Sequence, residues 1–511
     1  MNSLIAQLLK RCAAQPDADA VRSRDLRLSY AELMDAVANA TEQVRSLGLR
    51  RIGLYLDNGL DWIIFDLAAL AAGITAVPLP RFFSVAQIAH AIDDANLDGI
   101  VFDRELPIGV IASGIALPGF SDSRIQCIES RHAKLAPRSL ETPASSTPAP
   151  ARISYTSGST GAPKGVELGA DFIEQTATSL CQAIADLDIN VHLSILPYAT
   201  LLENIAGIYV PLLLGRCVHA EPAADIGLND VLGLDPAKLV TCFNRVRPNS
   251  LIITPQLLEL LCQLVDNAAI NPDCLEFVAV GGARVAPTLL QRARQAGIPA
   301  YEGYGLTEFG SVAMLNTPRN DRVGSVGKPL PGVSVSVTED GEICLARDLH
   351  CETEKGRQAL VRTGDLGSID GDGFVQLHGR KSNLIVLANG RNVSPEWIEA
   401  ELNASSSILQ SYVFSDDGEQ LAVLLASSAT DAELETTINC INQDLPAYAR
   451  VREWHRLTTP FSRVAQTLTA NGRLRRQQIA QQLPQLLSPG NVSPTPGRSG
   501  DRFSFQESNP C

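Results

Sequence analysis

The chain has 511 residues, of which 45% are hydrophobic and 19% charged, a balance typical of a folded protein with a large core and two or more domains. Its net charge of -14 argues against nucleic acid as a partner, because binding to a phosphate backbone needs a basic face. No hydrophobic run reaches the roughly 18 residues that a transmembrane segment needs. The eleven cysteines are scattered without a Cys-x-x-Cys pair, so we expect reduced thiols and a cytoplasmic protein.

The first two thirds of the chain predict an α/β fold. Residues 1–11 are too short and wrongly flanked for a signal peptide and are expected to form an amphipathic helix. From Arg51 onward, short hydrophobic runs alternate with segments of helical length, which is typical of a parallel sheet layered with helices. The expected strands are Arg51–Leu56, Asp98–Phe102, Ser194–Pro197, Ser250–Thr254 and Glu276–Val280. The expected helices are Asp61–Ala72, Val85–Ala95, Asp171–Asp186 and Pro255–Val265.

The pattern changes twice farther along the chain. From about Arg322, short strands rich in valine and glycine indicate a small β subdomain. Around Arg380 a compact α+β module begins, with strands near Ser411–Phe414 and Leu421–Leu425.

Two segments have the composition of linkers or tails. Residues 137–150 are of low complexity, and the end of the chain from about Ser488 is rich in serine, proline and glycine, so we expect it to be disordered. The expected organisation is a large N-terminal domain of residues 1–380, a mobile C-terminal domain of residues 381–485, and a disordered tail of residues 486–511.

The most informative stretch is Ile153–Glu167, which is rich in glycine and hydroxyl groups and contains Lys164. The backbone N–H groups of such a loop can surround phosphate oxygens, and the lysine adds a cation. The spacing is not that of the P-loop, which needs four residues between its first glycine and the Gly-Lys-Ser/Thr sequence. Alone, the stretch is consistent with a polyphosphate site or with a plain surface turn.

Three later motifs give this loop a context. Tyr301–Glu308 combines an aromatic ring, a hydroxyl and a carboxylate, Arg362–Leu366 contains an isolated acid, and Gly379–Arg380 opens a new segment. In this order the four motifs resemble the adenylate-forming (AMP-binding) superfamily, which includes acyl-CoA synthetases, firefly luciferase and the adenylation domains of peptide synthetases. The resemblance runs from about Leu28 to Arg473 and is strongest to bacterial long-chain acyl-CoA synthetases, which are fatty acid–CoA ligases.

The resemblance implies an AMP-forming acid–thiol ligase that uses ATP, Mg²⁺ and CoA. A carboxylate attacks the α-phosphate of ATP, pyrophosphate leaves, and the thiol of CoA then takes the acyl group and releases AMP. Two anions meet in the first step, so the site needs cations and oriented donors.

The resemblance also assigns phosphate and metal ligands. Thr307 would contact the α-phosphate, and Glu308 would hold Mg²⁺, an ion that prefers hard oxygen ligands together with substrate phosphates. The residues that would surround the β- and γ-phosphates are Thr156, Ser157, Gly158, Ser159, Thr160, Gly161 and Lys164.

Other positions would hold the nucleoside. Tyr304, followed by Gly305, would stack on adenine, and Gly282 and Ala283 would let the backbone approach the edge of the base. The pair Gly281–Gly282 alone is equally consistent with a strand-to-helix turn. The resemblance further implies that Asp365 accepts the ribose hydroxyls and that Arg380 binds ribose or phosphate.

The chain departs from the superfamily at three positions. Ser382 stands where the hinge usually has an acid or a lysine, and a small residue there can still absorb a backbone change. Thr200 stands where many members carry histidine or another ring beside the acyl group. Arg473 replaces the lysine that orients carboxylate and ATP, so it performs the lysine's role, slows adenylation or marks a lost activity.

The acid is expected to be a medium- or long-chain fatty acid. Leu202 stands where amino-acid-activating relatives carry an aspartate, so an α-amine would lack its counter-charge. The surrounding segment, Leu201–Val210, is mostly hydrophobic, as a pocket for an acyl chain or a buried core helix would be. The alternatives are an acyl-AMP ligase that loads an acyl carrier protein and an ATP-binding protein without adenylation activity.

Overall fold

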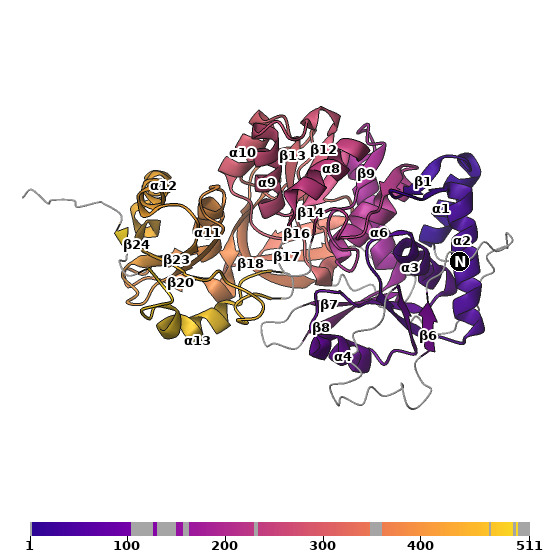
Figure 1. Cartoon of the computed structure of the whole chain (residues 1–511), viewed down its shortest axis with the longest axis horizontal. Coiled ribbons are helices and arrows are strands. Elements are labelled where there is room, and N and C mark those ends of the chain that lie inside the picture. Colours follow the sequence, from indigo (N-terminus) through magenta and orange to yellow (C-terminus); the bar gives the residue numbers. More distant parts are fainter. Residues whose placement is uncertain are drawn as a thin grey trace, which may run out of the picture. The chain divides into compact units, whose positions relative to one another are not determined.

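The computed structural model describes residues 3–103, 126–129, 150–156, 163–228, 234–347, 360–469, 472–493 and 497–498. The chain divides into two compact units (Figure 1). The first consists of Met1–Thr363 and Gly367–Leu377, and the second of Gly364–Leu366 and His378–Cys511. Each unit has its own hydrophobic core.

The first unit contains two large sheets whose strands are mainly parallel. The six-stranded sheet has the order β6 (Gln126–Glu129), β5 (Gly99–Phe102), β3 (Arg51–Tyr55), β4 (Thr75–Pro78), β7 (Arg152–Thr156) and β8 (Lys164–Leu168). The nine-stranded sheet has the order β15 (Lys328–Pro329), β14 (Met314–Leu315), β13 (Ala300–Tyr304), β12 (Phe277–Val280), β11 (Ser250–Ile253), β9 (Val191–Leu193), β10 (Cys217–His219), β1 (Asp19–Arg22) and β2 (Arg27–Ser29).

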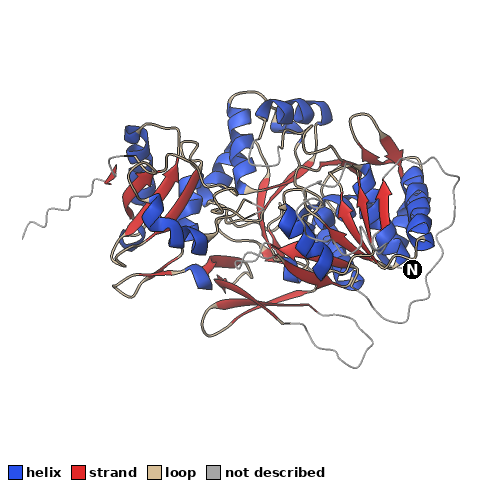
Figure 2. Cartoon of the chain, turned by 60° about the horizontal axis from the view of Figure 1, so that its bottom comes forward, coloured by secondary structure: helices blue, strands red, loops and turns tan. Residues whose placement is uncertain are grey.

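Helices flank these strands and fill the space between them (Figure 2). The helices of the first unit are α1 (Ser3–Ala14), α2 (Tyr30–Ser46), α3 (Leu60–Ala72), α4 (Val85–Asp94), α6 (Ala170–Ile184), the π-helix η1 (Glu203–Tyr209), α7 (Val210–Leu213), α8 (Pro236–Val246), α9 (Pro255–Asp266), α10 (Pro287–Gln295) and the 3₁₀ turns η2 (Pro272–Cys274) and η3 (Thr307–Phe309). One hydrophobic cluster joins α1, α2, α3, α6 and η1 to strands of both sheets. Nearly every residue of α3 is buried, as expected of a helix that is hydrophobic on all sides.

Local signals explain where several of these helices begin. Ser29 and Ser84 each form a capping box, in which the serine hydroxyl accepts a hydrogen bond from the third helical residue and that residue's side chain accepts one from the serine backbone. α8, α9 and α10 begin with proline, which lacks the N–H group that the first helical position leaves without a partner.

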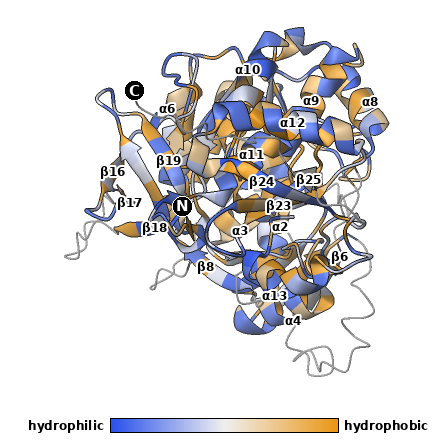
Figure 3. Cartoon of the chain, turned by 90° about the vertical axis from the view of Figure 1, so that its left-hand side faces the viewer, coloured by the Kyte–Doolittle hydropathy of each residue, from blue (hydrophilic) through white to orange (hydrophobic). Residues whose placement is uncertain are grey.

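A four-stranded sheet forms the small β subdomain, with strands β16 (Val333–Val337), β17 (Glu342–Arg347), β18 (Val361–Ile369) and β19 (Val375–Arg380), of which β16 and β17 are antiparallel. The second unit contains the 3₁₀ turns η4 (Lys381–Asn383) and η5 (Ala447–Ala449), the hairpin β20 (Ile385–Val386) and β21 (Asn392–Val393), the helices α11 (Pro395–Asn403), α12 (Asp431–Asp444) and α13 (Arg476–Leu486), and a sheet of β22 (Gln410–Phe414), β23 (Leu421–Ala426), β24 (Val451–Arg456) and β25 (Gly497–Arg498). The central strand β23 is strongly hydrophobic (Figure 3) and contributes to a cluster on each face of this sheet.

The structure confirms the predicted fold class, a layered α/β domain with a small β subdomain and an α+β domain. The expected strand at Ser194–Pro197 is wrong, since β9 ends at Leu193. Pro197 has no N–H group for a sheet, and its carbonyl instead accepts a hydrogen bond from the backbone of Thr200 to close a turn.

Some expected features concern the ends and linkers of the chain. Residues 137–149 lie outside the described residues. Of the expected tail, residues 486–493 and 497–498 are described, and β25 pairs with β24. None of the helices in the described ranges combines the length and the hydrophobicity that crossing a bilayer requires.

Candidate active site

Thr156 and Lys164 are the last pair of the β7–β8 hairpin, next to the segment that connects its two strands. They are direct cross-strand partners in this antiparallel pair, so both side chains project from the same face of the sheet. The Thr156 hydroxyl donates to the Lys164 carbonyl oxygen at 3.4 Å, while the Lys164 side chain is exposed. The other predicted phosphate ligands, Ser157 to Gly161, lie outside the described residues.

Helix α4 fixes both arms of this hairpin. The Tyr155 hydroxyl donates to Asp94 at 2.7 Å, and the His90 Nε2 atom lies 3.0 Å from the carbonyl oxygen of Pro163. Burial and the bond to Asp94 raise the pKa of Tyr155, so its hydroxyl keeps its proton. The backbone on either side of the predicted phosphate loop is therefore anchored by side chains of a single helix.

The ends of two parallel strands bring the predicted nucleoside residues together. Val280 of β12 is the register partner of Glu302 of β13, so Gly282 and Tyr304, each two residues farther along, lie level with one another. Gly282 has a φ angle of +82°, a conformation that favours glycine, and the space at its Cβ position is open. This edge of the sheet can thus receive a flat ring beside bare backbone.

A tight turn follows Tyr304 and carries Thr307 and Glu308 in η3. A Cβ atom on Gly305 would lie 1.9 Å from the carbonyl oxygen of Ser311, so only glycine is accommodated there. The Ala313 N–H donates to the Tyr304 carbonyl oxygen at 2.8 Å and closes the turn. Strand β8, which begins at Lys164, packs next to η3.

Glu308 has the chemistry expected of a magnesium ligand. Its side chain is exposed, and within the described residues no hydrogen bond or ion pair occupies its carboxylate. No group of three or more His, Cys, Asp or Glu side chains that could hold a metal occurs among the described residues. The donor set that would fit Mg²⁺ is therefore one carboxylate together with oxygens of a bound phosphate.

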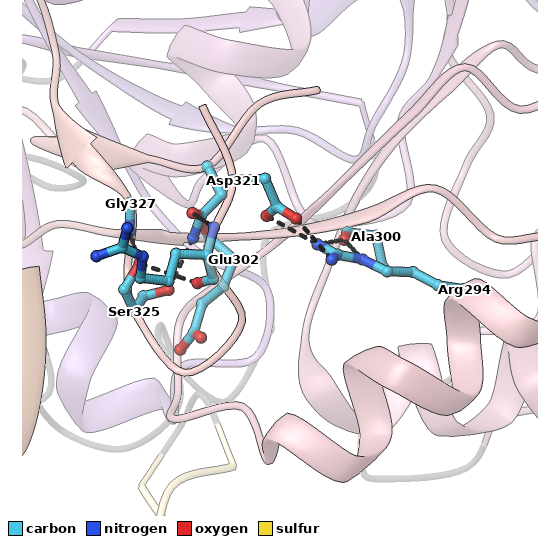
Figure 4. A network of polar contacts seen from close by, with 8 residues as sticks. Arg294, Ala300, Glu302, Asp321, Ser325 and Gly327 are labelled. Carbon is cyan, nitrogen blue, oxygen red and sulfur yellow. Dashed lines mark hydrogen bonds and ion pairs between the residues drawn. The ribbon is translucent and has the colours of Figure 1, made fainter. Parts of the chain in front are cut away.

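Glu302 was not among the predicted site residues, although it lies in β13 two residues before Tyr304. Its carboxyl group is buried and accepts a hydrogen bond from the Val285 N–H at 3.4 Å, just beyond Gly282 and Ala283. Figure 4 shows its side chain pointing away from the Arg294–Asp321 ion pair. Burial raises the pKa of Glu302 to about 8, because the charged form would lose its hydration.

The remaining predicted residues gather in the second unit. An Arg380 guanidinium nitrogen lies 3.6 Å from a carboxylate oxygen of Asp365, and more than half of the Arg380 side chain is exposed. Arg473 follows a turn in which the Thr469 hydroxyl accepts a hydrogen bond from the Arg473 N–H at 3.0 Å. Surrounding protein and the charge of Arg380 lower the pKa of Arg473, although its side chain keeps an exposed surface.

The segment that was expected to surround an acyl chain is mostly core. Ile205, Ile208 and Val210 are buried in the hydrophobic cluster of the first unit, whereas Leu202 is half-buried. Among these hydrophobic residues lies Glu203, which is fully buried and 3.1 Å from the His192 Nε2 atom. Burial raises the pKa of Glu203 from its usual value. Sequence alone gives no signal for this pair, because the two residues belong to different elements.

Comparison with known proteins places the chain in a family. The model for AMP-binding enzymes matches residues 8–348, and the model for the AMP-binding enzyme C-terminal domain matches residues 382–487. A long-chain-fatty-acid–CoA ligase, FadD15 of Mycobacterium bovis, is 24% identical over 88% of this chain and 92% of its own length. A 2-succinylbenzoate–CoA ligase of Bacillus cereus is 26% identical over 86% of this chain and 92% of its own length.

Solved structures agree with this fold. The O-succinylbenzoate CoA synthetase of Bacillus subtilis in complex with ATP and magnesium has a TM-score of 0.73 at 21% identity, over 93% of this chain and 99% of that one. The anthranilate CoA ligase AuaEII with anthranoyl-AMP has a TM-score of 0.79 at 18% identity, over 95% of this chain and 98% of that one. With family models spanning most of the sequence, the chain belongs to the AMP-binding enzyme family of the adenylate-forming superfamily and is an acid–thiol ligase.

Proposed function

We propose that this enzyme activates a medium- or long-chain fatty acid with ATP and then transfers the acyl group to CoA. A carboxylate oxygen of the acid attacks the α-phosphorus, and the bond to pyrophosphate breaks. The CoA sulfur then attacks the acyl carbon as a thiolate, and AMP leaves. The observation that carries this proposal is twofold: Gly282 and Tyr304 lie level at the ends of β12 and β13, and the turn η3 with Glu308 packs next to the strand that begins at Lys164.

The residues at this edge supply donors and charge. Lys164 and Thr156, with the loop residues 157–161 between them, would hold the β- and γ-phosphates, and Thr307 the α-phosphate. Bound Mg²⁺, with Glu308 as its protein ligand, would offset the negative charge of the phosphates. Tyr304 would stack on adenine, next to the bare backbone of Gly282, with Ala283 and Gly305 as the neighbouring residues in the chain.

Three charged residues of the second unit complete the assignment. Asp365 would accept the ribose hydroxyls, with Arg380 beside it to bind ribose or phosphate. Arg473 would orient the carboxylate against ATP in place of the usual lysine, since a guanidinium can donate to two oxygens at once. The exposed surface of its side chain supports a role in binding anions.

The choice of a fatty acid rests on the charges around η1. The resemblance puts Thr200, shortly before η1, beside the acyl group, and the only ionisable carboxylate of η1, Glu203, is paired with His192. An α-amine would find no free counter-charge there, and η1 carries no cation for a second carboxylate. The similarity to the long-chain-fatty-acid–CoA ligase supports the same choice.

A second candidate substrate is an aromatic acid with a further carboxylate. Several relatives are named 2-succinylbenzoate–CoA ligases, and they are as similar to this chain as the fatty acid ligase is. Such an acid would need a cation near its second carboxylate, so the absence of a basic residue from η1 favours the fatty acid.

CoA is the proposed acceptor, since the relatives of this chain are named CoA ligases. An acyl carrier protein remains an outcome that the experiment below can distinguish. We propose a cytoplasmic location, which the free thiols of the described cysteines support.

The test is acid-dependent release of pyrophosphate from ATP and Mg²⁺ with fatty, aromatic and amino acids, each with and without CoA. Release with fatty acids, and acyl-CoA when CoA is added, is the expected result. If only 2-succinylbenzoate causes release of pyrophosphate, the substrate is that acid and not a fatty acid. If pyrophosphate is released but no acyl-CoA forms, the acceptor is a carrier protein and not CoA. ATP binding without release for any acid would contradict the proposed activity.

A further inference from the structure

The π-helix η1 carries three buried polar side chains for which the proposed chemistry has no direct use. Glu203, Asn204 and Tyr209 are fully buried within the hydrophobic cluster of the first unit. π-Helical turns are rare and occur frequently at functional sites. The hydrogen bonds of these three side chains connect η1 to both large sheets of the first unit.

One set of contacts ties η1 to the nine-stranded sheet. Glu203 lies 3.1 Å from the Nε2 atom of His192 in β9, and the Nδ1 atom of the same ring lies 2.9 Å from the Ser250 hydroxyl in β11. A Cβ atom on Gly207 would come within 2.5 Å of a Glu203 carboxyl oxygen, so the glycine makes room for this contact. The nine-stranded sheet is the one whose edge carries Gly282 and Tyr304.

A second set ties η1 to the six-stranded sheet. The Asp66 carboxylate of α3 forms an ion pair with Arg152 at the start of β7. The same carboxylate accepts hydrogen bonds from the Tyr209 hydroxyl at 2.5 Å and from the Asn204 amide at 2.9 Å. Arg152 also donates to the Tyr209 hydroxyl at 3.1 Å, so residues of β7 and η1 converge on one carboxylate of α3.

Stability alone is a weak explanation for this cluster. Moving two charges out of water is costly, and a well-packed hydrophobic pair in the same place is often as stable or more so. The Arg152 side chain is only 2% exposed, and its Nη1 atom has no hydrogen-bond partner within the described ranges. What a buried ion pair supplies better than hydrophobic packing is a defined geometry, because its hydrogen bonds are directional.

The Asp66–Arg152 ion pair fixes the start of the strand that ends at the proposed phosphate site. Arg152 begins the strand that ends at Thr156, and the predicted phosphate loop follows directly. We propose that Asp66, Arg152 and Tyr209 are positioning residues, which hold the β7–β8 hairpin at a fixed place relative to η1 and so to the nucleoside edge of the other sheet. The inference rests on the proposed function, because that function assigns the hairpin to the phosphates of ATP.

The double variant Asp66→Asn, Arg152→Met tests this role without leaving a buried charge unpaired. The new amide can still accept from Tyr209 and Asn204, so we expect the variant to fold and to unfold cooperatively. Its KM for MgATP should rise about tenfold or more, since small misplacements of binding groups cost one to two orders of magnitude. The KM for the acid should change much less, because Glu203 and His192 still hold η1.

Hydrogen exchange gives a second readout that needs no nucleotide. In the double variant the amides of β7 and β8 should exchange faster than in the wild type. The milder variant Tyr209→Phe removes one hydroxyl from the cluster and should shift KM for MgATP and exchange in the same direction by less. If the double variant does not fold, the KM and hydrogen exchange of Tyr209→Phe test the positioning role instead.

The control removes another ion pair of the first unit. Arg292 of α10 bonds to Glu259 of α9 at 2.8 Å, and the variant Glu259→Gln, Arg292→Met should leave the KM for MgATP unchanged. A folded Asp66→Asn, Arg152→Met variant with wild-type KM and wild-type exchange of β7 and β8 would overturn the inference alone. A wild-type enzyme that neither binds MgATP nor releases pyrophosphate would instead overturn the proposed function and the inference with it.

Discussion

Glu302 is an ionisable residue that folding removes from water. Its carboxyl group is buried and accepts a hydrogen bond from the Val285 N–H, and its pKa is raised to about 8 by that burial. The folded protein therefore keeps a proton that the unfolded chain gives up near the usual pKa of 4.5. Between these two values the folded state binds more protons, so the contribution of Glu302 to stability falls as the pH rises.

Replacing this carboxyl group by an amide should remove that dependence. Glu302→Gln can still accept the hydrogen bond from Val285, but it has no proton to lose. We expect the variant to gain stability relative to the wild type as the pH rises from 5 to 8, by up to about 1.4 kcal/mol per pH unit. Urea unfolding of both proteins at several pH values measures this difference, and Glu276→Gln is an exposed control. Curves that stay parallel would show that Glu302 does not hold this proton.

Arg473 allows the two half-reactions to be separated. It lies near Asp365 and Arg380 in its own unit, follows a tight turn and keeps an exposed surface. Arg473→Ala should slow acid-dependent pyrophosphate release at least about a hundredfold, as expected when an oriented cation is removed from a charged transition state. Thioester formation from supplied acyl-AMP and CoA should change far less.

The conservative change provides the control. Arg473→Lys restores the residue usual in the superfamily and should retain or raise the rate of pyrophosphate release, because a cation stays in place. Equal losses in both half-reactions of Arg473→Ala would remove this residue from the proposed role.

At the scale of elements, the turn after β13 is the part of the site with the least freedom. The Gly305 position faces the carbonyl oxygen of Ser311 so closely that no side chain is accommodated. Gly305→Ala must therefore move the turn that carries Thr307 and Glu308, at a cost of about 1–3 kcal/mol from overpacking. We expect a lower melting temperature together with a large loss of pyrophosphate release. Gly282→Ala, which meets open space but a φ of +82°, should keep η3 in place and lose less activity.

The sequence predicts elements well where a local pattern decides them. Eight elements lie within two residues of the ranges predicted from hydrophobic runs: the helices α3, α4, α6 and α9 and the strands β3, β5, β11 and β12. In each of them the spacing of hydrophobic residues is that of one type of element, and a turn or a helix cap marks its end. The prediction fails at Ser194–Pro197, where a hydrophobic run contains a proline that turns the chain. It also missed the π-helix at Glu203–Tyr209, since a wider turn leaves no periodic signal in seven residues.

The candidate site shows the same division. Thr156, Lys164, Thr307 and Glu308 lie in short continuous motifs, so their chemistry can be inferred from neighbouring residues. Glu302 and the Asp66–Arg152 pair acquire their surroundings only when distant segments pack, and Asp66 lies 86 positions before its partner. One signal in the sequence does point to the Asp66–Arg152 pair. Asp66 lies in the hydrophobic segment of α3, and a buried charge implies a partner elsewhere in the chain.

At the scale of the whole molecule, each compact unit carries a core of its own. In the second unit, one hydrophobic cluster packs α11 and α12 on the sheet, and another packs α13 on it. The buried Glu399 carboxylate accepts a hydrogen bond from the Val413 N–H at 2.7 Å and pairs with Arg476, so a polar contact also joins its first and last helices. These contacts all lie within residues 378–498, which is long enough for an independent domain.

A fragment of residues 378–511 should therefore fold without the rest of the chain. We expect cooperative thermal unfolding and dispersed amide signals in an NMR spectrum, since the sheet β22–β25 and its three helices bury their hydrophobic faces against one another. Trp454, which is buried in the first of these clusters, should give a blue-shifted fluorescence that moves to the red on unfolding. Val423→Ala, which opens a cavity at a fully buried position, is expected to cost about 1–3 kcal/mol and to lower the midpoint. A collapsed amide spectrum for the unmodified fragment would mean that this core needs contacts from the first unit.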